Sequence, residues 1–347
     1  AEKPPKLYDL TTLQREANRF FGYTAQQTLD YLQFLYEKKL ATYPRTDSRY
    51  LTEDMGEGLP GLCRTVAGAF PFGKSFSGET AAGQVIDNKK VSDHHAILPT
   101  GEVNSKSAEA LPTGERNVLA LVTARLLCAV SPGNYGYEDT VVTLRCMGEE
   151  FSVKGRRETA EGWKAVERAF LKSVKPGKES EQAQEQEPEM AGLLPELLEG
   201  QSVIVEAAVV RSGATSPPKR YTEDLLLSAM ENAGAEDFRE AGETEHRGIG
   251  TPATRAGIIE KLVKGSFAER RGRQLIPTTQ GMGLIKVLPE TLKSARLTAE
   301  WEAALKEVER GKQSPENFLA GITRMVQELV ESYRNTETTV QGVLSAP

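Results

Sequence analysis

The chain has 347 residues, of which 39% are hydrophobic, 27% charged and 7% aromatic, and its formal net charge is −6. This length predicts two or three domains, and the composition excludes a chain that is disordered throughout. No apolar run is long enough to span a bilayer, and residues 1–20 lack the apolar core of a signal peptide, so we expect a cytoplasmic protein with no membrane partner. The three cysteines are far apart in sequence, which predicts buried thiols rather than disulfides or a zinc site.

The first part of the chain is predicted to be helical. Two pairs of side chains have the spacing of a capping box at a helix start, Thr11 with Gln14 and Thr24 with Gln27. Leucines at helical spacing follow the second pair. Pro44 prevents a regular continuation and favours an extended backbone at Tyr43. We therefore expect a short strand or loop to present the Tyr43 phenol.

The middle of the chain combines helical and β patterns. A helix is predicted between Ala108 and Val130, and a hairpin over Thr140–Cys146 and Glu150–Val153 with its turn around Gly148. Between Lys178 and Glu189, five glutamates and one lysine predict a solvated acidic loop. Alternating valines over Val203–Val209 predict a strand with one buried face.

The last third resembles a winged helix in its order of elements. Helices are predicted after Thr222, from Thr251 to Gly265, from Thr298 to Arg310 and from Pro315 to Tyr333. Two short β segments between Phe267 and Thr278 predict the wing. Arg247–Lys286 carries eight basic and two acidic residues, a net charge of +6, which fits either a nucleic-acid surface or a solvated helix face.

The most specific segment is TYPRTDSRYL at Thr42–Leu51. A tyrosine is a weak nucleophile at neutral pH because the ordinary pKa of its phenol is about 10, so it needs help from a cation or a base. Side chains two residues apart share a face of an extended segment, so Arg45 could bind the phosphate that Tyr43 attacks. A Tyr-Pro turn is more often structural, and the spacing alone does not identify catalysis.

Four motifs together resemble the type IA DNA topoisomerases, closest to the topoisomerase III-like branch. They are LYDLTTLQREANRFFGYTAQQTLDYLQFLYEKKLATYPRTDSRYL at residues 7–51, SDHHAILPT at 92–100, PPKRYTEDLL at 217–226 and GIGTPATRAGIIEKL at 248–262. They occur in the family's order and cover most of the chain from Pro5 to about Tyr333. This resemblance favours a catalytic role for Tyr43 over a structural one.

The resemblance implies a role for each matching residue. Tyr43 is expected to be the nucleophile that forms a 5′-phosphotyrosine link with single-stranded DNA, and Arg45 to contact the phosphate at the cleaved bond. Asp47 and Ser48 complete the motif as further DNA contacts. His94 matches a histidine near the active tyrosine, whereas we expect its neighbour His95 to be structural.

Thr251, Thr254 and Arg255 stand at a predicted helix start, where hydroxyls, a guanidinium and free backbone N–H groups could bind DNA phosphates. Ordinary helix capping explains them equally well. No metal site is predicted in this chain, because adjacent side chains such as His94 and His95 usually point apart and no third metal-binding side chain lies near them in sequence.

The expected fold is mainly α with β-rich segments (α+β), including winged-helix or helix-turn-helix units, as in the central part of the family's toroid. The expected domains are an active-tyrosine helical domain at 1–136, β-rich arch segments at 137–175 and 191–213, an acidic flexible loop at 176–190, a winged-helix-like DNA-binding domain at 214–334 and a tail at 335–347.

The resemblance also implies the reaction. Single-stranded DNA is cleaved, a strand is passed through the break and the break is religated, so that the DNA is relaxed or decatenated. Family members hold Mg²⁺ with an Asp-x-Asp cluster in an N-terminal metal-binding (toprim) domain, and this chain has no Asp-x-Asp. We therefore expect this chain to be a central fragment that holds no cofactor. Its expected partners are single-stranded DNA and the metal-binding domain, and the fragment alone is not expected to complete relaxation. Association with the bacterial nucleoid or a plasmid is expected.

Two other functions fit parts of the pattern. A single-stranded-DNA-binding winged-helix module without catalytic activity is the main alternative, favoured by the missing magnesium cluster. A tyrosine recombinase is weaker, because its Arg/His/Arg set should precede a tyrosine near the C-terminus, whereas Tyr43 lies near the start of the chain.

Overall fold

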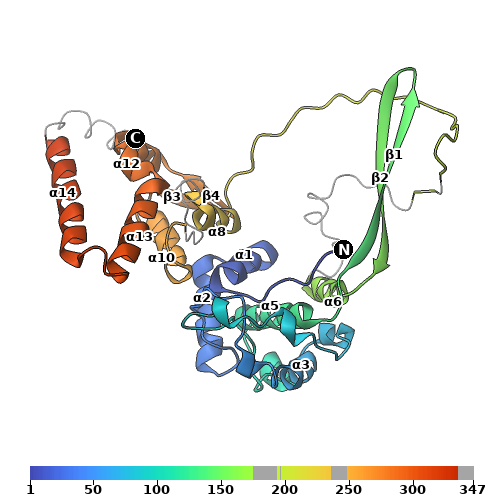
Figure 1. The fold of residues 1–347 in the computed structure, drawn as a ribbon, viewed down its shortest axis with the longest axis horizontal. Helices are drawn as coiled ribbons and strands as arrows, with labels where there is room; N and C mark the ends of the chain where they lie inside the picture. The colour runs from blue at the N-terminus through green and yellow to red at the C-terminus, as the bar shows by residue number, and fades with distance from the viewer. Residues whose placement is uncertain (175–193, 196, 236–247, 335–347) are drawn as a thin grey trace. The chain divides into compact units, whose positions relative to one another are not determined.

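The computed structural model describes residues 1–174, 194–195, 197–235 and 248–334 (Figure 1). The predicted acidic loop at 176–190 and the tail at 335–347 lie outside the described residues. The chain folds into two compact units, each built from segments that are distant in sequence. Unit 1 comprises Ala1–Tyr8, Leu32–Pro44 and Ser48–Lys219, and unit 2 comprises Asp9–Tyr31, Arg45–Asp47 and Arg220–Pro347. Each unit is described by itself.

The described residues are mainly helical, with two small antiparallel sheets, β1–β2 and β3–β4. The helices of eight or more residues are α1 (Leu10–Phe21), α2 (Ala25–Glu37), α3 (Leu59–Ala67), α5 (Thr113–Val130), α6 (Lys164–Val174), α8 (Glu223–Asn232), α10 (Pro252–Lys264), α11 (Thr279–Val287), α13 (Ala295–Glu309) and α14 (Pro315–Arg334). Two short helices are α4 (Ser105–Glu109) and α12 (Glu290–Lys293), and short 3-10 turns connect parts of unit 1. The strands are β1 (Gly136–Cys146), β2 (Glu149–Ala160), β3 (Ala268–Arg271) and β4 (Gln274–Pro277).

The core of unit 1 surrounds α5, which is buried along most of its length. Helices α3 and α6 and the 3-10 turn at Pro71–Ser75 pack against it. Phe72 from that turn meets Phe170 of α6 edge to face, with 5.5 Å between the ring centroids. Cys63 and Cys128 are buried, as the sequence predicted, whereas Cys146 at the end of β1 is only half-buried. Burial raises the pKa of the Cys63 thiol to about 12.

The predicted hairpin in unit 1 is confirmed and is longer than expected (Figure 1). Cys146 pairs with Glu149, so the turn consists of Met147 and Gly148, both with positive φ, 54° and 89°. Positive φ at both central residues is what a two-residue type I′ hairpin turn requires. Ion pairs across the strands, such as that between Arg156 and Asp139 at 2.6 Å, extend the pairing beyond the apolar segments that the sequence pattern detected.

The strand predicted over Val203–Val209 is wrong, because the structure assigns no strand there. Val203, Val205 and Val209 are 44%, 58% and 79% exposed. Alternation predicts a strand only where a neighbouring strand completes the hydrogen bonds and a core receives one face. Among the described residues, none forms a ladder with this segment.

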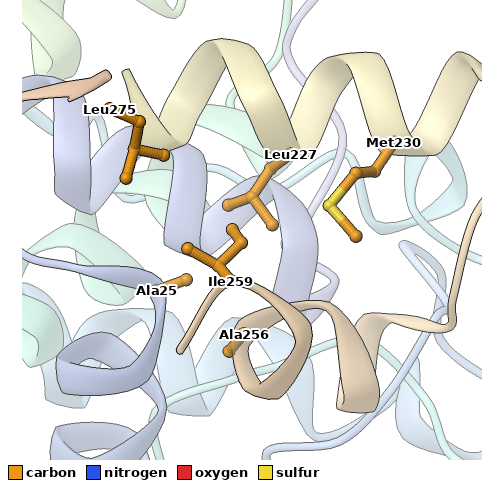
Figure 2. Packing of buried hydrophobic residues seen from close by; sticks show 6 residues of the cluster. All are labelled: Ala25, Leu227, Met230, Ala256, Ile259 and Leu275. Carbon is orange, nitrogen blue, oxygen red and sulfur yellow. The ribbon is translucent and has the colours of Figure 1, made fainter. Parts of the chain in front are cut away.

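The core of unit 2 joins helices that are distant in sequence. Figure 2 shows Leu227 and Met230 of α8 facing Ala256 and Ile259 of α10, together with Ala25 at the start of α2 and Leu275 of β4. Helix α1 also contacts α8, where Arg15 and Asp224 form an ion pair with 2.8 Å between Nε and Oδ1. This core fixes the first turns of α2, α8 and α10 within one unit.

Most predicted helix starts in unit 2 are correct. Thr24 and Gln27 form the reciprocal capping bonds at 2.9 and 3.0 Å, and the Thr222 hydroxyl accepts from the Leu225 N–H. The first capping box is wrong, because Asp9 caps α1 by accepting from the Thr12 N–H at 2.6 Å. The box residues Thr11 and Gln14 lie inside α1 and are buried.

The predicted wing is confirmed as β3 and β4, which follow α10 and precede α11. Gly272 at its turn has φ of 60°, which favours glycine. The last two long helices, α13 and α14, also match their predicted positions and lie side by side (Figure 1). Among the described residues, no helix is long and apolar enough to cross a membrane.

Candidate active site and DNA-binding residues

Tyr43 lies in unit 1, just after a segment held by backbone hydrogen bonds. The Thr42 N–H donates to the Leu98 carbonyl, and the Leu98 N–H donates to the Thr42 hydroxyl, both at 2.9 Å. Ala41 also forms an antiparallel bridge with Pro99. These bonds fix the backbone immediately before Tyr43, which lies in neither a helix nor a strand, as Pro44 predicted.

The half-buried Tyr43 ring contacts two other rings. The His94 ring centroid is 4.2 Å away with an interplanar angle of 34°, and Tyr36 of α2 meets Tyr43 edge to face at 5.7 Å. Two residues that are far apart in sequence, Tyr43 and His94, are thus brought together. The next side chain, His95, points back to its own backbone, with 2.7 Å between Nδ1 and the Ala96 carbonyl oxygen.

Burial alternates along the motif that follows Tyr43. Arg45 and Asp47 are exposed, whereas Thr46 and Ser48 are buried, as expected for an extended segment. The Ser48 hydroxyl donates to the Lys90 carbonyl at 2.8 Å and accepts from the Tyr50 N–H at 3.1 Å. These bonds give Ser48 a structural role, while Arg45 and Asp47 are directed to solvent, where a DNA strand could reach them.

In unit 2, Thr251 and Thr254 are exposed at the start of α10. The Thr251 N–H donates to the Thr254 hydroxyl at 2.8 Å, and the two hydroxyl oxygens are 3.1 Å apart. Helix capping therefore accounts for both threonines without a ligand. A DNA phosphate at this helix start remains a prediction.

Arg255 turns away from solvent and is 3% exposed. Its guanidinium donates to the Ile249 carbonyl at 3.1 Å and to the Thr11 hydroxyl at 2.9 Å. Burial lowers the pKa of Arg255, and the charges of Glu231 and Asp9 oppose this shift. These contacts favour a structural role that joins α10 to α1, and they weaken the prediction that Arg255 binds DNA.

The basic segment of unit 2 is only partly available to a ligand. Arg270 is bound to Glu223 and Glu260, with N–O distances of 2.8 and 2.5 Å. The exposed basic residues of the described part of this segment are Lys261, Lys264, Arg271, Arg273 and Lys286. The positive surface predicted from the sequence is therefore smaller than its net charge indicates, and it includes the turn of the wing.

The described residues contain no group of three His, Cys, Asp or Glu side chains that could hold a metal ion. His94 and His95 diverge, since one lies against Tyr43 and the other against a backbone carbonyl. The described residues therefore do not fit the magnesium site that the family implies.

Two features of unit 1 were not predicted from the sequence. Tyr36 of α2 is 41% exposed and contacts Tyr43. Lys6 and Lys90 both lie over the ring of Tyr50, at 5.2 and 4.7 Å from its centroid. No local spacing could indicate this cluster, because its three members are distant in sequence.

A family model described as DNA topoisomerase matches residues 1–320. The chain belongs to the type IA DNA topoisomerases, which confirms the resemblance. DNA topoisomerase 3 of Bacillus subtilis (strain 168) is 38% identical over 350 residues, covering 96% of this chain and 46% of that protein. DNA topoisomerase 3 of Shouchella clausii (strain KSM-K16) is 37% identical over 340 residues, covering 94% and 44%.

A solved structure has the same fold. Full-length topoisomerase I from Thermotoga maritima superposes with a TM-score of 0.60 at 22% identity, covering 94% of this chain and 50% of that one. The chain spans about half the length of the curated relatives it matches.

Proposed function

We propose that this chain is the part of a type IA DNA topoisomerase that carries the nucleophile and cleaves single-stranded DNA through a 5′-phosphotyrosine intermediate. Strand passage and religation then relax or decatenate the DNA. The observation that carries the proposal is the position of Tyr43, which is half-buried against His94 and two residues before the exposed Arg45. This arrangement lies in the region matched by the family model.

The proposed cleavage is a transesterification. The Tyr43 phenol loses its proton and its oxygen forms a bond to phosphorus, while the bond from phosphorus to the 3′ oxygen breaks and that oxygen takes a proton. Rejoining is the reverse reaction, in which the 3′ hydroxyl attacks the phosphotyrosine and releases Tyr43. No oxidant, reductant or nucleotide is consumed, because one phosphodiester replaces another.

His94 and Arg45 have complementary roles in the proposed site. The His94 imidazole contacts the Tyr43 ring in a tilted arrangement, with 4.2 Å between the ring centroids, and its proposed role is to stabilise charge on the phenol oxygen or on the phosphate. The Arg45 guanidinium provides paired N–H donors to the phosphate oxygens as negative charge develops on them. Tyr36 contacts the nucleophile edge to face, with 5.7 Å between the ring centroids.

The test is covalent trapping on a 5′-labelled and a 3′-labelled single-stranded oligonucleotide. The full chain is supplied with the metal-binding domain that the family implies, and the reaction is stopped with denaturant. We expect an adduct that retains the DNA fragment attached through its 5′ phosphate, and peptide mapping should find the modification at Tyr43. Tyr43→Phe deletes one oxygen and keeps the ring, so we expect loss of the adduct with little change in DNA binding.

Tyr221→Phe is the matched control, since it removes one phenol oxygen elsewhere in the chain. It is expected to retain the adduct. The proposal fails if an adduct persists in Tyr43→Phe, if the modification maps to another tyrosine, or if the supplemented wild-type chain forms none.

Binding of single-stranded DNA without chemistry is the second candidate function. It is favoured by unit 2, where the hairpin β3–β4 presents Arg271 and Arg273 next to α10 and α11. The same trapping assay separates the two functions, because a binding module gives salt-sensitive binding and no covalent adduct under any condition.

A further inference from the structure

Two lysines converge on one tyrosine in unit 1. The ammonium of Lys6 lies 5.2 Å, and that of Lys90 4.7 Å, from the centroid of the Tyr50 ring. Both lysines are exposed and Tyr50 is half-buried, so the cluster is open to solvent. It is separate from the Tyr43 ring and its two neighbours, and the proposed transesterification does not use it.

The backbone holds each member of the cluster in place. The Ser48 hydroxyl bonds to the backbone of both Lys90 and Tyr50, and the Tyr50 carbonyl accepts from the Ala96 N–H at 2.9 Å. The backbone of Lys6 is held by Arg125, whose guanidinium donates to the Lys6 carbonyl at 3.3 Å. The three side chains are therefore presented by fixed segments rather than by free loop tips.

The cluster has an excess of positive charge. Among the described residues, Asp87 is the acidic partner of this cluster, and it pairs with Lys90 at 2.9 Å. The charge of Lys90 is therefore compensated, whereas no described residue compensates that of Lys6. Hydrogen bonding from Lys6 is the main cause that lowers the pKa of the Tyr50 phenol, against partial burial and with the charges of both lysines adding to it. Two ammonium groups near one ring repel each other, and a bound anion would relieve this repulsion.

The cluster lies close to the nucleophile along the backbone. The Ala96 N–H binds the Tyr50 carbonyl, and the Leu98 N–H binds the Thr42 hydroxyl next to Tyr43. Donors two residues apart on an extended segment are about 7 Å apart and point to the same side. Tyr50 and Thr42 are therefore neighbours along one side of the segment 96–98.

We propose that Lys6, Tyr50 and Lys90 form a binding site for one backbone phosphate of single-stranded DNA, near the phosphate that Tyr43 attacks but distinct from it. This inference rests on the proposed function, since it assigns a second contact on the same strand. Two ammonium groups and a phenol O–H supply donors from several directions, which suits the oxygens of a phosphodiester. Its role is to set the register of the strand, so that a particular linkage reaches Tyr43.

The first experiment measures binding of a fluorescent single-stranded oligonucleotide by anisotropy over a salt series. The full chain is compared as wild type, as Lys6→Ala with Lys90→Ala, and as Lys89→Ala. We expect the double variant to bind about tenfold more weakly at low salt, and its slope of log affinity against log salt to fall by about 0.7, the value for one phosphate contact on a single strand. Lys89→Ala removes one positive charge beside the cluster, at the residue before Lys90, and is expected to bind like the wild type.

The second experiment replaces single phosphates of the oligonucleotide, one at a time, by uncharged methylphosphonates. At one position, we expect the methylphosphonate to weaken binding of the oligonucleotide to the wild type and to leave its binding to the double variant unchanged. Tyr50→Phe is expected to give an intermediate loss, because it removes one donor and keeps both cations. Far-ultraviolet circular dichroism of each variant verifies that the exposed substitutions leave the fold intact.

The inference is overturned if the double variant keeps the wild-type affinity and slope, if Lys89→Ala is equally weak, or if no methylphosphonate position distinguishes the two proteins. These readouts are noncovalent. A failure of the Tyr43 assignment therefore appears in adduct mapping alone, whereas a failure of this inference appears in binding alone.

Discussion

The environment of each arginine decides what it can do in this protein. Arg45 and Arg255 both belong to motifs that resemble DNA contacts of the family. Arg45 is exposed in an extended segment, and Arg255 is 3% exposed with its guanidinium bonded to Ile249 and Thr11. A buried guanidinium that already satisfies protein acceptors has less to offer a phosphate. Arg45 is therefore the better candidate for direct contact with the reacting group.

We predict that Arg45→Ala lowers both DNA affinity and adduct formation, because a phosphate contact acts in the ground state as well as in the transition state. The expected loss of cleavage is about 10- to 1000-fold, the range for one electrostatic donor at a reacting oxygen. Arg45→Lys restores the charge but not the two-pronged geometry, so only part of the activity should return.

The measurement for Arg45 is single-turnover adduct formation at saturating oligonucleotide, together with anisotropy for affinity. Arg64→Ala is the matched control, because it removes the same charge from an exposed arginine outside the motif. A wild-type cleavage rate in Arg45→Ala would show that the guanidinium does not act on the phosphate.

At this scale the sequence predicted the extended backbone at Tyr43, because Pro44 prevents a regular helix there. The role of Tyr43 as nucleophile comes from the family resemblance and stays a prediction. The sequence could not predict the cluster of Lys6, Tyr50 and Lys90, since their proximity depends on tertiary packing. It also could not decide whether Arg255 is buried, because an α-helical position is assigned to a face only when its packing partner is known.

Among the elements, α8 joins the most distant parts of unit 2. Glu223 in its first turn is 3% exposed, accepts from the Ala25 N–H at 2.6 Å and forms an ion pair with Arg270 of β3 at 2.8 Å. One carboxylate thus connects the starts of α2 and α8 with the wing. Glu260 of α10 binds the same guanidinium, so Arg270 is shared by two elements.

We predict that Glu223→Gln lowers the free energy of unfolding of unit 2 by about 2 kcal/mol, because the amide keeps the size but leaves Arg270 with one charged partner instead of two. Arg270 is partly exposed, so solvent screening keeps the loss below that of a fully buried pair. Denaturant unfolding followed by circular dichroism is the measurement.

The control for Glu223 is Glu269→Gln, which breaks the exposed pair between Glu269 and Arg271 in the same hairpin. This change is expected to stay within about 0.5 kcal/mol of the wild type. Equal effects of the two substitutions would show that Glu223 is no more than a surface partner.

Elements with a strong local signal were predicted from the sequence, and the reasons are visible in the structure. Pro252 and Gly265 bound α10, Thr222 caps α8 and Gly148 occupies the hairpin turn. The predictions were wrong where a partner distant in sequence determines the local structure. Asp9 replaced Thr11 as the cap of α1, and within the part of the chain that the structure describes the alternating valines of 203–209 have no neighbouring strand and remain exposed.

At the scale of the whole molecule, positive charge is concentrated in local surfaces although the net charge of the chain is −6. The exposed basic residues near the wing and the cluster around Tyr50 provide positive surfaces within an acidic protein. Exposed arginines such as Arg45 and exposed aromatic rings such as Tyr36 suit a flexible strand better than a regular double helix, because unpaired bases can stack and the backbone can follow the surface.

We therefore predict that the full chain binds single-stranded DNA more tightly than blunt duplex of equal length, and that its affinity falls linearly with salt on a double-logarithmic plot. Competition between labelled single strands and unlabelled duplex, from low to physiological ionic strength, measures both properties. Preference for duplex, or an affinity independent of salt, would contradict this prediction.

The division into two units could not be predicted from the sequence. Domain boundaries in sequence are inferred from contiguous changes in composition, and the structure instead groups Asp9–Tyr31 with Arg220–Pro347. Only the packing of α1 and the start of α2 against α8 and α10 reveals this grouping, since α1 carries an ordinary amphipathic pattern that would fit any apolar partner.

This discontinuity has a consequence for the order in which the protein is made. The ribosome completes Asp9–Tyr31 long before it reaches Arg220, and at about 5 to 20 residues per second the delay is roughly 10 to 40 s. Helix α1, which contacts α8 and α10 in the finished protein, lacks these two partners throughout that interval. Unit 2 is therefore expected to mature only late in translation, and its first helix to depend on shielding by a chaperone while the rest of the chain emerges.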